Sequence, residues 1–567
     1  MQVSSNEADA FARYLSANSA FWKQQRDPQS SAPDKIIYVD IYHSDPEYLR
    51  LNCLVGRYIQ HRRGGKLVGL LQAGRPRKSI ITEQSIENTT ALARSFGIED
   101  IITIETGQMH CPASHSFIET LKDLHGSDLK EAILRYVSPT GLPVGLYAYE
   151  NHLRSYLVET ITDYDDELED SLREACMLEA KFKELFAELG CDVIVSGHLV
   201  YSFWAIMAHT GLLSGASVVY CHPLSPEQVF IFDTPPPFGR PAQVLCRQAD
   251  TDAFHQVLWP NRHALTRSVE ATIRGAEVGL KAPEWWIKPT PEGEVREVRR
   301  RAVRERLGWS ESKPVIAVCA HTFSDAPMSD VSCYNDYFTW IEETLRIAAR
   351  DPGRYYLFKR HPFDTLYCVT GASDRLYAPY GGYDHIRVVG SEITREDLLA
   401  VTDLGVTIRG SLGYDLPAHG IPCLLAGRAP YSDIGFCEVA GSPEQYEAML
   451  VGTAGEERVS DDNRFRAQLY FCLNQLFGGL NSPHILGRDL RMPEEMYWTY
   501  LTRRVELFSV EQDPLYRNLF DSWERRAGRV LNFDLIDFLR GSDRTSRQPP
   551  CGQPFSPWPN AGGEPGP

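Results

Sequence analysis

The stretch LGVTIRGSLGYDLPAHGIPCLLAGRAPYSDIGF, residues 404–436, predicts a strand, a glycine turn, a short helix and a second strand. The apolar runs 404–408 and 422–426 are typical of short buried strands, and the helix between them ends near Gly420. A helix that links two strands in this way carries the chain back along the sheet, so the strands lie parallel. The stretch therefore predicts a parallel α/β sheet.

The glycine turn also predicts a binding site. Gly410 and Gly413 allow the backbone to approach a ligand closely, and Ser411 can cap the helix and donate to a phosphate. The free N–H groups and the dipole of a helix start favour an anion, and Asp415 lies in the first turn. The pattern is neither GxGxxG nor a Walker loop, so NAD and ATP chemistry gain no support. The alternative interpretation is a plain βαβ turn without a ligand.

The same alternation extends outward through both halves of the chain. Further strands are predicted in the second half at 314–320, 354–359, 386–389 and 436–439, with helices at 335–350, 394–402 and 443–450. Strands in the first half are predicted at 35–41, 66–71, 100–104, 192–197, 217–221 and 228–232, with a long helix at 170–190. Strands that alternate with helices predict doubly wound sheets. Two such domains that face each other bring their strand carboxyl ends to a shared cleft.

Composition shifts predict the domain boundaries. An α/β domain is expected over 1–280, a proline-containing linker with a basic helix over 281–310, a second α/β domain over 311–490, a helical segment over 491–540 and a disordered tail over 541–567. The basic helix, EVREVRRRAVRERLGW, is interpreted as a solvated helix face rather than an anion site. The aromatic-rich helical segment can pack back across the first domain.

Bulk properties restrict the class of protein. The chain has 567 residues, more than one hydrophobic core usually serves. Its 58 basic and 75 acidic residues give a net charge of −17, which argues against a general nucleic-acid binder. Apolar runs are too short to cross a bilayer and the N-terminus is polar, so a cytoplasmic protein is expected. The 13 cysteines show no CxxC and no zinc spacing, which indicates reduced thiols and no metal site.

A second candidate segment is AHTFSDAP (320–327), which follows the predicted strand 314–320. His321 and Asp325 lie where an α/β sheet meets its ligand, and they can hydrogen-bond a sugar or its leaving phosphate. The alternative is a loop that Asp325 stabilises by capping the following turn.

A third candidate segment is FKRHPFD (358–364), after the strand 354–359. Lys359, Arg360 and His361 gather two cations and an imidazole at a strand end, and Pro362 fixes the local backbone. Such a group suits a phosphate ester, whose charge grows as it leaves. The alternative is a surface turn with incidental basic residues.

Together these segments resemble bacterial capsule and surface-polysaccharide biosynthesis proteins. The resemblance lies in H-x-F-S-D-A-P, D-Y-x-x-W-I-x-x-T-L, K-x-HP, T-x-x-GS-x-G-x-(D/E) and G-I-P-x-L-x-A-G-x-A-x-Y, and it is densest over 314–450. The family includes capsular Kdo transferases, and its HP and Ser motifs are similar to those of sialyltransferases that hold a CMP-sugar. Asp415 stands where the family usually has Glu, and Arg360 replaces a residue that is often proline.

The resemblance implies a GT-B-like fold, with two Rossmann-like domains facing a cleft, and a set of donor-binding residues. That set is His321, Asp325, Lys359, Arg360, His361, Pro362, Arg409, Gly410, Ser411, Gly413, Asp415 and Tyr431. The resemblance continues more weakly over 143–156 and 192–220.

The weaker part of the resemblance implies the acceptor side. Glu150 occupies the family's acidic position, so it is the candidate general base that deprotonates the acceptor hydroxyl, and His361 is the second catalytic candidate. His152, Arg154 and His198 are expected to line the acceptor side. Each of these has an ordinary structural role as its alternative.

The sequence-based hypothesis is a metal-independent glycosyltransferase that needs no cofactor. Its expected partners are a nucleotide sugar, with a CMP-sugar such as Kdo favoured, and a surface polysaccharide or lipid-linked glycan at the inner face of the membrane. The alternatives are a CDP-alcohol phosphotransferase, a non-catalytic scaffold of glycan assembly and, less favoured, a nucleotide-sugar epimerase.

Overall fold

A computed structural model describes most of the chain. The described residues are 5–25, 35–43, 45–73, 83–106, 112–223, 227–274, 293–310, 313–327, 331–362, 364, 371–452, 459–480, 482–485 and 492–542. The predicted disordered tail lies outside the described residues except for its first two positions, and so does most of the predicted linker before residue 293.

The first sheet has six strands in the order β3-β2-β1-β4-β5-β6. Its strands are β1 (Ile36–Asp40), β2 (Lys66–Ala73), β3 (Asp100–Glu105), β4 (Val193–Ser196), β5 (Ser217–His222) and β6 (Gln228–Phe232). All neighbours pair in parallel except β5 and β6, which are antiparallel. The strand order reverses between β1 and β4, the mark of a doubly wound sheet.

The second sheet repeats this topology with all of its strands parallel, in the order β12-β11-β10-β7-β8-β9. Its strands are β7 (Val315–Cys319), β8 (Tyr355–Lys359), β9 (Ile386–Val389), β10 (Leu404–Thr407), β11 (Cys423–Leu425) and β12 (Glu438–Val439). Here the order reverses between β7 and β10. Each of the 12 predicted strands corresponds to an observed one, because a strand covered on both faces is a nearly continuous apolar run.

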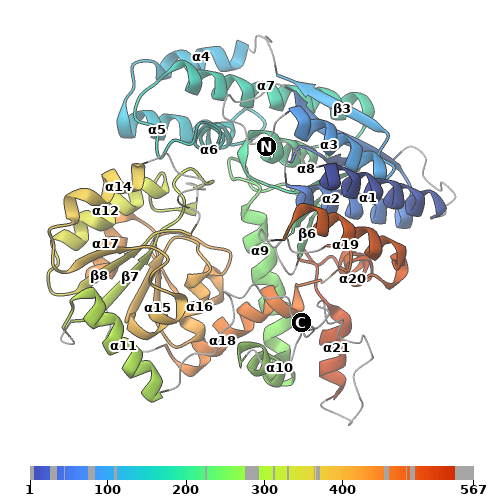
Figure 1. Cartoon of the computed structure of the whole chain (residues 1–567). Coiled ribbons are helices and arrows are strands. Elements are labelled where there is room, and N and C mark those ends of the chain that lie inside the picture. Colours follow the sequence, from blue (N-terminus) through green and yellow to red (C-terminus); the bar gives the residue numbers. More distant parts are fainter. Residues whose placement is uncertain are drawn as a thin grey trace.

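Helices cover the faces of both sheets (Figure 1). In the first half they are α1 (Ser5–Gln24), α2 (Pro46–Arg63), α3 (Glu83–Ser95), α4 (Pro112–Leu121), α5 (Gly126–Leu134), α6 (Val144–Tyr156), α7 (Asp166–Leu189), η1 (Tyr201–Ala205), α8 (Ile206–Leu213), α9 (Val244–Asp252), η2 (Ala253–Leu258), η3 (Trp259–Asn261) and α10 (Arg262–Arg274).

In the second half they are α11 (Gly293–Leu307), α12 (Tyr337–Ala349), α14 (Ala372–Tyr377), η5 (Ala378–Tyr380), α15 (Arg395–Val401), α16 (Leu412–Ala418), η6 (Ser432–Ile434), α17 (Pro443–Gly452), α18 (Asp461–Cys472), η7 (Leu473–Phe477), α19 (Glu494–Glu506), η8 (Val510–Gln512), α20 (Pro514–Glu524) and α21 (Phe533–Ser542). No described helix is long and apolar enough to cross a membrane.

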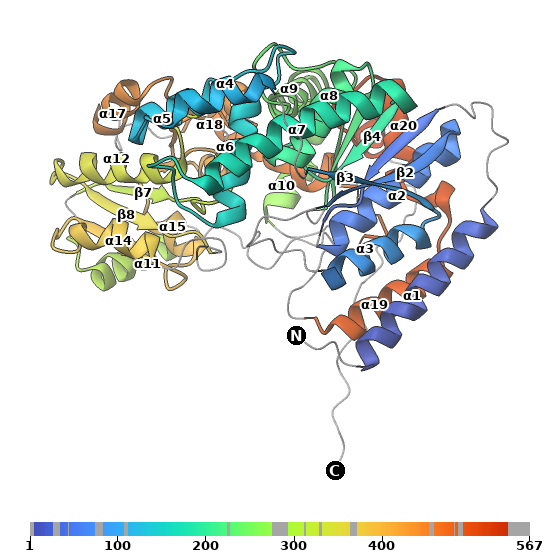
Figure 2. The same ribbon diagram turned by 90° about the horizontal axis from the view of Figure 1, so that it is seen from above.

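The chain returns to the first domain at its C-terminal end. Helix α19 lies beside α1 in both views (Figures 1 and 2), and its Trp498 contacts the rings of Phe11 and Tyr14. Residues of α19 and α20 belong to the core that the first sheet buries. The helices η2 to α10 and α21 instead share a core with α16 and α18 of the second half. Helices from each half of the chain therefore pack against the domain that the other half forms.

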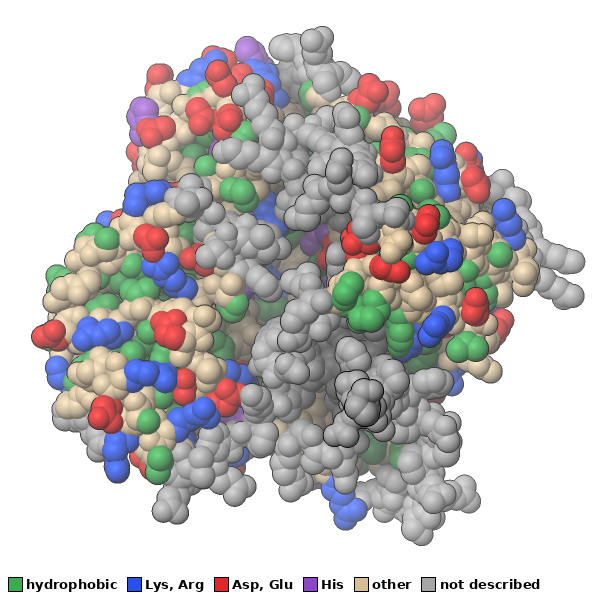
Figure 3. Space-filling view, viewed as in Figure 1, with side chains coloured by type: hydrophobic (Ala, Val, Ile, Leu, Met, Phe, Trp, Pro, Cys, Tyr) green, Lys and Arg blue, Asp and Glu red, His purple; other side chains and the backbone are tan. Residues whose placement is uncertain are grey.

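Helix α11, the predicted basic helix, is exposed along one side and also forms ion pairs with the second domain. Arg299 and Arg306 each form an ion pair of 3.0 Å with Asp397, at the start of α15, and Arg300 pairs with Asp403 at 2.8 Å. These three arginines have acidic partners in the second domain, so they also serve packing. On the face shown in Figure 3, basic and acidic side chains are interspersed and form no broad basic surface.

A buried ion pair fixes one of the crossings between domains. The Arg529 guanidinium is fully buried and pairs with Asp250 of α9, and its Nη2 donates to Asn474 of η7 at 2.9 Å. The Tyr470 hydroxyl of α18 donates to the other oxygen of Asp250 at 2.7 Å. Three chain segments thus meet at one carboxylate.

We expect Asp250→Ala to lower the free energy of unfolding by about 3–5 kcal/mol, because it leaves the Arg529 charge buried without its counter-ion. Urea unfolding followed by tryptophan fluorescence measures the change. The matched control is Asp521→Ala, which removes a solvent-exposed pair with Arg525 and should cost less than about 1 kcal/mol. Equal effects of the two substitutions would contradict the assigned role of the buried pair.

Candidate functional site

The points where the strand order reverses gather polar side chains in both sheets. In open α/β sheets a ligand crevice forms at this point, outside the carboxyl ends of the strands. In the first sheet His43 follows β1 and His198 follows β4, and in the second sheet His321 follows β7 and Arg409 follows β10. All four side chains are partly exposed.

A hydrogen bond joins these two edges. The Tyr201 hydroxyl, in the segment after β4, donates to Asp325 Oδ1 at 2.7 Å, in the loop after β7. Tyr201 has a φ of 64°, and it begins the π-helix η1. Positive φ in an aromatic residue is strained and is concentrated at functional sites. We call His43, His198, Tyr201, His321, Asp325 and Arg409 the interdomain site.

Helix α6 supplies two further charges to the interdomain site. Burial raises the pKa of the Tyr201 hydroxyl, the carboxylates of Asp325 and Glu150 add to the rise, and Arg154 opposes it. Glu150 is 1 % exposed and Arg154 is one helical turn further along α6. The structure therefore brings the predicted Glu150 and Arg154 to the same site as Asp325, which the sequence places far away.

His321 lies at the centre of the second-domain half. Its ring stacks on Tyr337 at 4.5 Å and faces His361 at 6.4 Å between ring centroids. Its Nε2 is buried and has no hydrogen-bond partner among the described residues. Burial lowers the pKa of His321 to about 3, with His361 and Arg409 adding to the fall and Asp325 opposing it. The imidazole is therefore neutral at neutral pH.

Gly410 is in close contact with this imidazole. A Cβ atom at position 410 would lie 3.5 Å from His321 Nε2 and 2.9 Å from Thr407 Oγ1, so only glycine fits comfortably. The Gly410 N–H donates to Thr407 Oγ1 at 3.3 Å. The backbone of the glycine turn thus packs beside His321.

An arginine-lined cavity of about 20 Å³ lies where α9 meets the second domain. Among the described residues that line it are Arg247 of α9, Arg409 and Arg428, and no acidic side chain. Asp433 bridges two of them at its rim, at 3.3 Å from Arg247 Nε and 2.9 Å from Arg428 Nη1. The cluster is a local concentration of positive charge in an acidic protein.

The side chains of the KRHP segment, residues 359–362, lie in two different places. His361 contacts the interdomain site, and burial lowers its pKa while Asp325 and Asp364 oppose the shift. Lys359 Nζ donates to the Gly390 carbonyl, and burial lowers the pKa of this amine. Pro362 is exposed.

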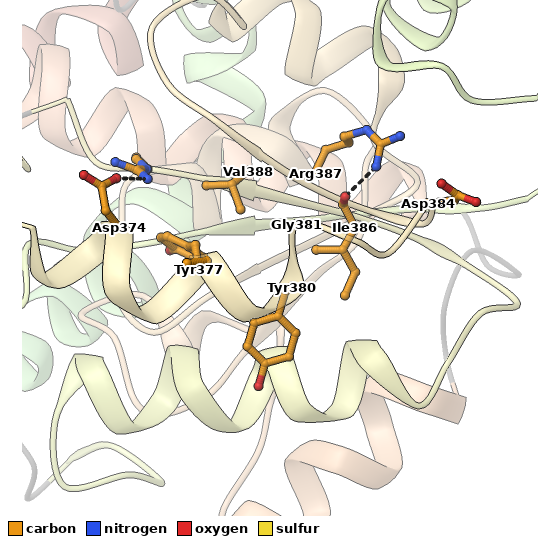
Figure 4. Close-up of a pocket in the computed structure, with 10 residues that line it drawn as sticks. Asp374, Tyr377, Tyr380, Gly381, Asp384, Ile386, Arg387 and Val388 are labelled. Carbon is orange, nitrogen blue, oxygen red and sulfur yellow. Dashed lines mark hydrogen bonds and ion pairs between the residues drawn. The ribbon is translucent and has the colours of Figure 1, made fainter.

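Arg360 turns away from His361. It pairs with Asp374 at 2.6 Å and lies over the Tyr377 ring at 5.4 Å. It lines a separate pocket of about 480 Å³ beside the edge strand β9 (Figure 4), together with Tyr380 and Arg387. Arg360 thus contributes to this edge pocket and not to the interdomain site.

The other predicted residues of the glycine turn contact groups of the protein itself. Ser411 is exposed and forms the N-cap of α16 without a side-chain capping bond. A Cβ at Gly413 would lie 2.0 Å from the Tyr431 hydroxyl, so the close approach there is to Tyr431 and not to a ligand. Tyr431 is buried and donates to the Gly410 carbonyl at 2.6 Å, which fixes the turn. Asp415 accepts from Arg395 Nε at 2.6 Å.

His152 lies on another face of α6. Its Nδ1 is 3.2 Å from the Ser171 hydroxyl of α7, and its ring packs on Tyr156 at 4.8 Å. Burial lowers its pKa to about 4. The structure therefore gives His152 a place between two helices and not beside Arg154.

Sequence reasoning missed several residues of the site. His43 had a signal, because it follows a predicted strand of the first sheet, as His321 does in the second. Tyr201 and Arg428 follow predicted strands, and Tyr337 belongs to the D-Y-x-x-W-I motif, so each had a signal of this kind. Arg247 had none, since its position depends on how the two domains pack. Among the described residues no group of three or more His, Cys, Asp or Glu side chains is placed to hold a metal ion.

Comparison with solved structures finds similar proteins with this architecture. Two are beta Kdo transferases of Thermosulfurimonas dismutans KpsC. The match to the 2,7 transferase has 13% identity and a TM-score of 0.30, and it covers 57% of this chain and 89% of that chain. The match to the 2,4 transferase has 11% identity and a TM-score of 0.29, and it covers 51% of this chain and 85% of that chain. A third is Anabaena Alr3699/HepE in complex with UDP, 9% identical with a TM-score of 0.26, covering 87% and 100%.

No protein-family model matches the chain, and no curated protein matches it in sequence. The chain has a GT-B-like fold of two Rossmann-like, doubly wound domains. All of these TM-scores are below 0.5, so the function is argued from the residues of the site.

The neutral state of His321 predicts a pH dependence of stability. Its pKa of about 3 in the folded protein is below the value of about 6.5 in the unfolded chain, so the unfolded state binds the extra proton between these values. Stability from this residue is complete above about pH 6.5 and is lost as the pH falls. Between pH 7 and 5 we expect wild type to lose about 2 kcal/mol more than His321→Gln in urea unfolding. Parallel curves of stability against pH for wild type and His321→Gln would contradict the assignment of a neutral His321.

Proposed function

We propose that the chain transfers a sugar from a nucleotide-activated donor to a glycan acceptor at the interdomain site. The observation that carries the proposal is the bond between Tyr201 and Asp325, which joins the reversal points of two doubly wound sheets. Two substrates of a transfer reaction can then meet, one on each sheet. Holding both in line supplies a large part of the rate of such a reaction.

The donor half of the proposal uses the second domain. Arg409 lies in the arginine-lined cavity and also acts on the pKa of His321. Its guanidinium can neutralise the charge that grows on the departing phosphate, and the neutral imidazoles of His321 and His361 can donate to the same oxygens. Arg247 and Arg428 extend this positive charge. We favour a CMP-activated sugar such as Kdo because the HP and GS motifs resemble those of CMP-sugar transferases.

The acceptor half of the proposal uses the first domain. Glu150 is the candidate base, because its carboxylate lies close enough to Tyr201 and Tyr337 to raise the pKa of both, after burial itself. A buried carboxylate near the transferring centre can take the proton of an acceptor hydroxyl. Arg154 and His198 lie on the same side. We propose that the acceptor is a surface polysaccharide or a lipid-linked glycan, met in the cytoplasm.

The donor site predicts selective nucleotide binding. A ligand that binds only the folded state raises the melting temperature by mass action. We expect one nucleotide among CMP, CDP, UDP, GDP and ADP, with CMP favoured, to raise it by several degrees, and His361→Ala and Ser411→Ala to weaken the shift. The matched control is His125→Ala, whose side chain is 70 % exposed. No shift with any nucleotide would count against the proposed transferase.

The candidate base predicts a separation of chemistry from binding. Glu150→Gln keeps the shape of the side chain, so we expect the nucleotide shift to persist while the transfer rate falls by about 100-fold or more. Glu179→Gln is the control, because Glu179 is a buried carboxylate bound to Ser138 and Lys183 away from the site. The assay contains EDTA, since we propose metal-independent transfer. A requirement for a divalent cation would contradict metal-independent transfer. A Glu150→Gln variant that stays active would contradict the role of Glu150 as the base.

A further inference from the structure

The two histidines of the first-domain half form a direct pair. His43 Nε2 lies 3.0 Å from His198 Nε2, across the point where the strand order reverses. A bond between two ring nitrogens needs one of them to carry the proton and the other to be bare. The pair therefore has two possible directions, and the surrounding contacts decide between them.

The backbone next to His43 fixes the direction. The N–H of Asp45 donates to His43 Nδ1 at 2.9 Å, so Nδ1 carries no proton. In a neutral imidazole the proton then resides on Nε2, and His43 donates through it to His198. His198 must accept with a bare Nε2, and its own proton resides on Nδ1. Protonating His198 a second time would place two N–H groups against each other.

Ring packing holds this arrangement in place. His43 stacks on Tyr48 at 4.2 Å with an angle of 18° between the planes, and His198 packs edge-on against Trp204 at 5.0 Å. Burial lowers the pKa of His43 to about 4 and also lowers that of His198, with Arg154 adding to both shifts. Turning the His43 ring over would lose the bond from Asp45.

The Nδ1–H of His198 is the donor that this pair can offer to a ligand. Its ring is 6.1 Å from that of Tyr201, the residue that bridges to Asp325, so the group lies beside the interdomain site. Its basic nitrogen is occupied by His43, which excludes His198 as a general base in this arrangement. A fixed N–H suits an oxygen lone pair and not a hydroxyl proton.

We propose that His43 is a positioning residue that locks His198 in its Nδ1–H tautomer, so that His198 donates a hydrogen bond to an oxygen of the carbohydrate acceptor. The inference rests on the proposed function, and it assigns His198 to acceptor binding and not to proton abstraction.

The test uses the geometry of amide side chains. The amide of Asn reaches the position of Nδ1 and that of Gln the position of Nε2. We therefore expect the acceptor KM to be about 10-fold higher in His198→Gln than in His198→Asn, because only the Asn amide can still donate from the position of Nδ1, and one hydrogen bond in binding is worth about this much. Equal loss of kcat in both variants would indicate a base and overturn the proposal.

A second measurement does not depend on activity. Long-range ¹H–¹⁵N NMR correlations of histidine-labelled full-length protein distinguish the two neutral tautomers, and the His198→Asn spectrum assigns the signals. We expect Nδ1–H for His198 in wild type and a shift toward Nε2–H in His43→Phe, which keeps an aromatic ring beside Tyr48. An Nε2–H form in wild type would overturn the lock. Absence of glycosyl transfer alongside an Nδ1–H signal would refute the proposed function and the acceptor contact, but not the lock.

Discussion

A buried carboxylate joins the two domains beside helix α6. Asp336 begins helix α12 of the second domain and is fully buried. It accepts from the hydroxyls of Tyr149 at 2.6 Å and Thr160 at 2.5 Å, and Lys130 lies 3.3 Å away, all from the first domain. A buried charge that lost these partners would cost several kcal/mol, so the domains stay joined here. Because Tyr149 precedes Glu150 in α6, the same contact sets where Glu150 lies.

Once α6 is fixed, the chemistry of the interdomain site follows from burial. Burial lowers the pKa of His43, His198 and His321, so each of these rings holds a single proton at neutral pH. Neutral imidazoles present fixed dipoles without the desolvation cost of a full charge. The positive charge comes from Arg154 and Arg409, whose guanidinium groups stay charged when partly buried. The arginines of the site thus supply positive charge, and its neutral histidines supply hydrogen bonds.

The sequence allowed the sheets to be predicted but only part of the site. Buried parallel strands are apolar runs at regular intervals, so each strand could be read from local composition. Strand-end residues such as His321 and Arg409 followed from the same logic. The positions of Gly413, Tyr431 and Arg360 could not be predicted in this way. Tertiary packing decides that Gly413 lies against the Tyr431 ring and that Arg360 lines the pocket beside β9. His43 follows β1 as His321 follows β7, so its place at the site could have been predicted in the same way.

The strained Tyr201 gives a physical reason to regard the interdomain site as functional and not only as an interface. The contact from Tyr149 to Asp336, by comparison, comes from ordinary helical backbone within α6. At Tyr201 the chain accepts that strain in the segment that follows β4, which also contains His198. The same turn positions His198 against His43 and the Tyr201 hydroxyl against Asp325. Backbone strain is retained where it aims side chains, and here it aims two of them at one place.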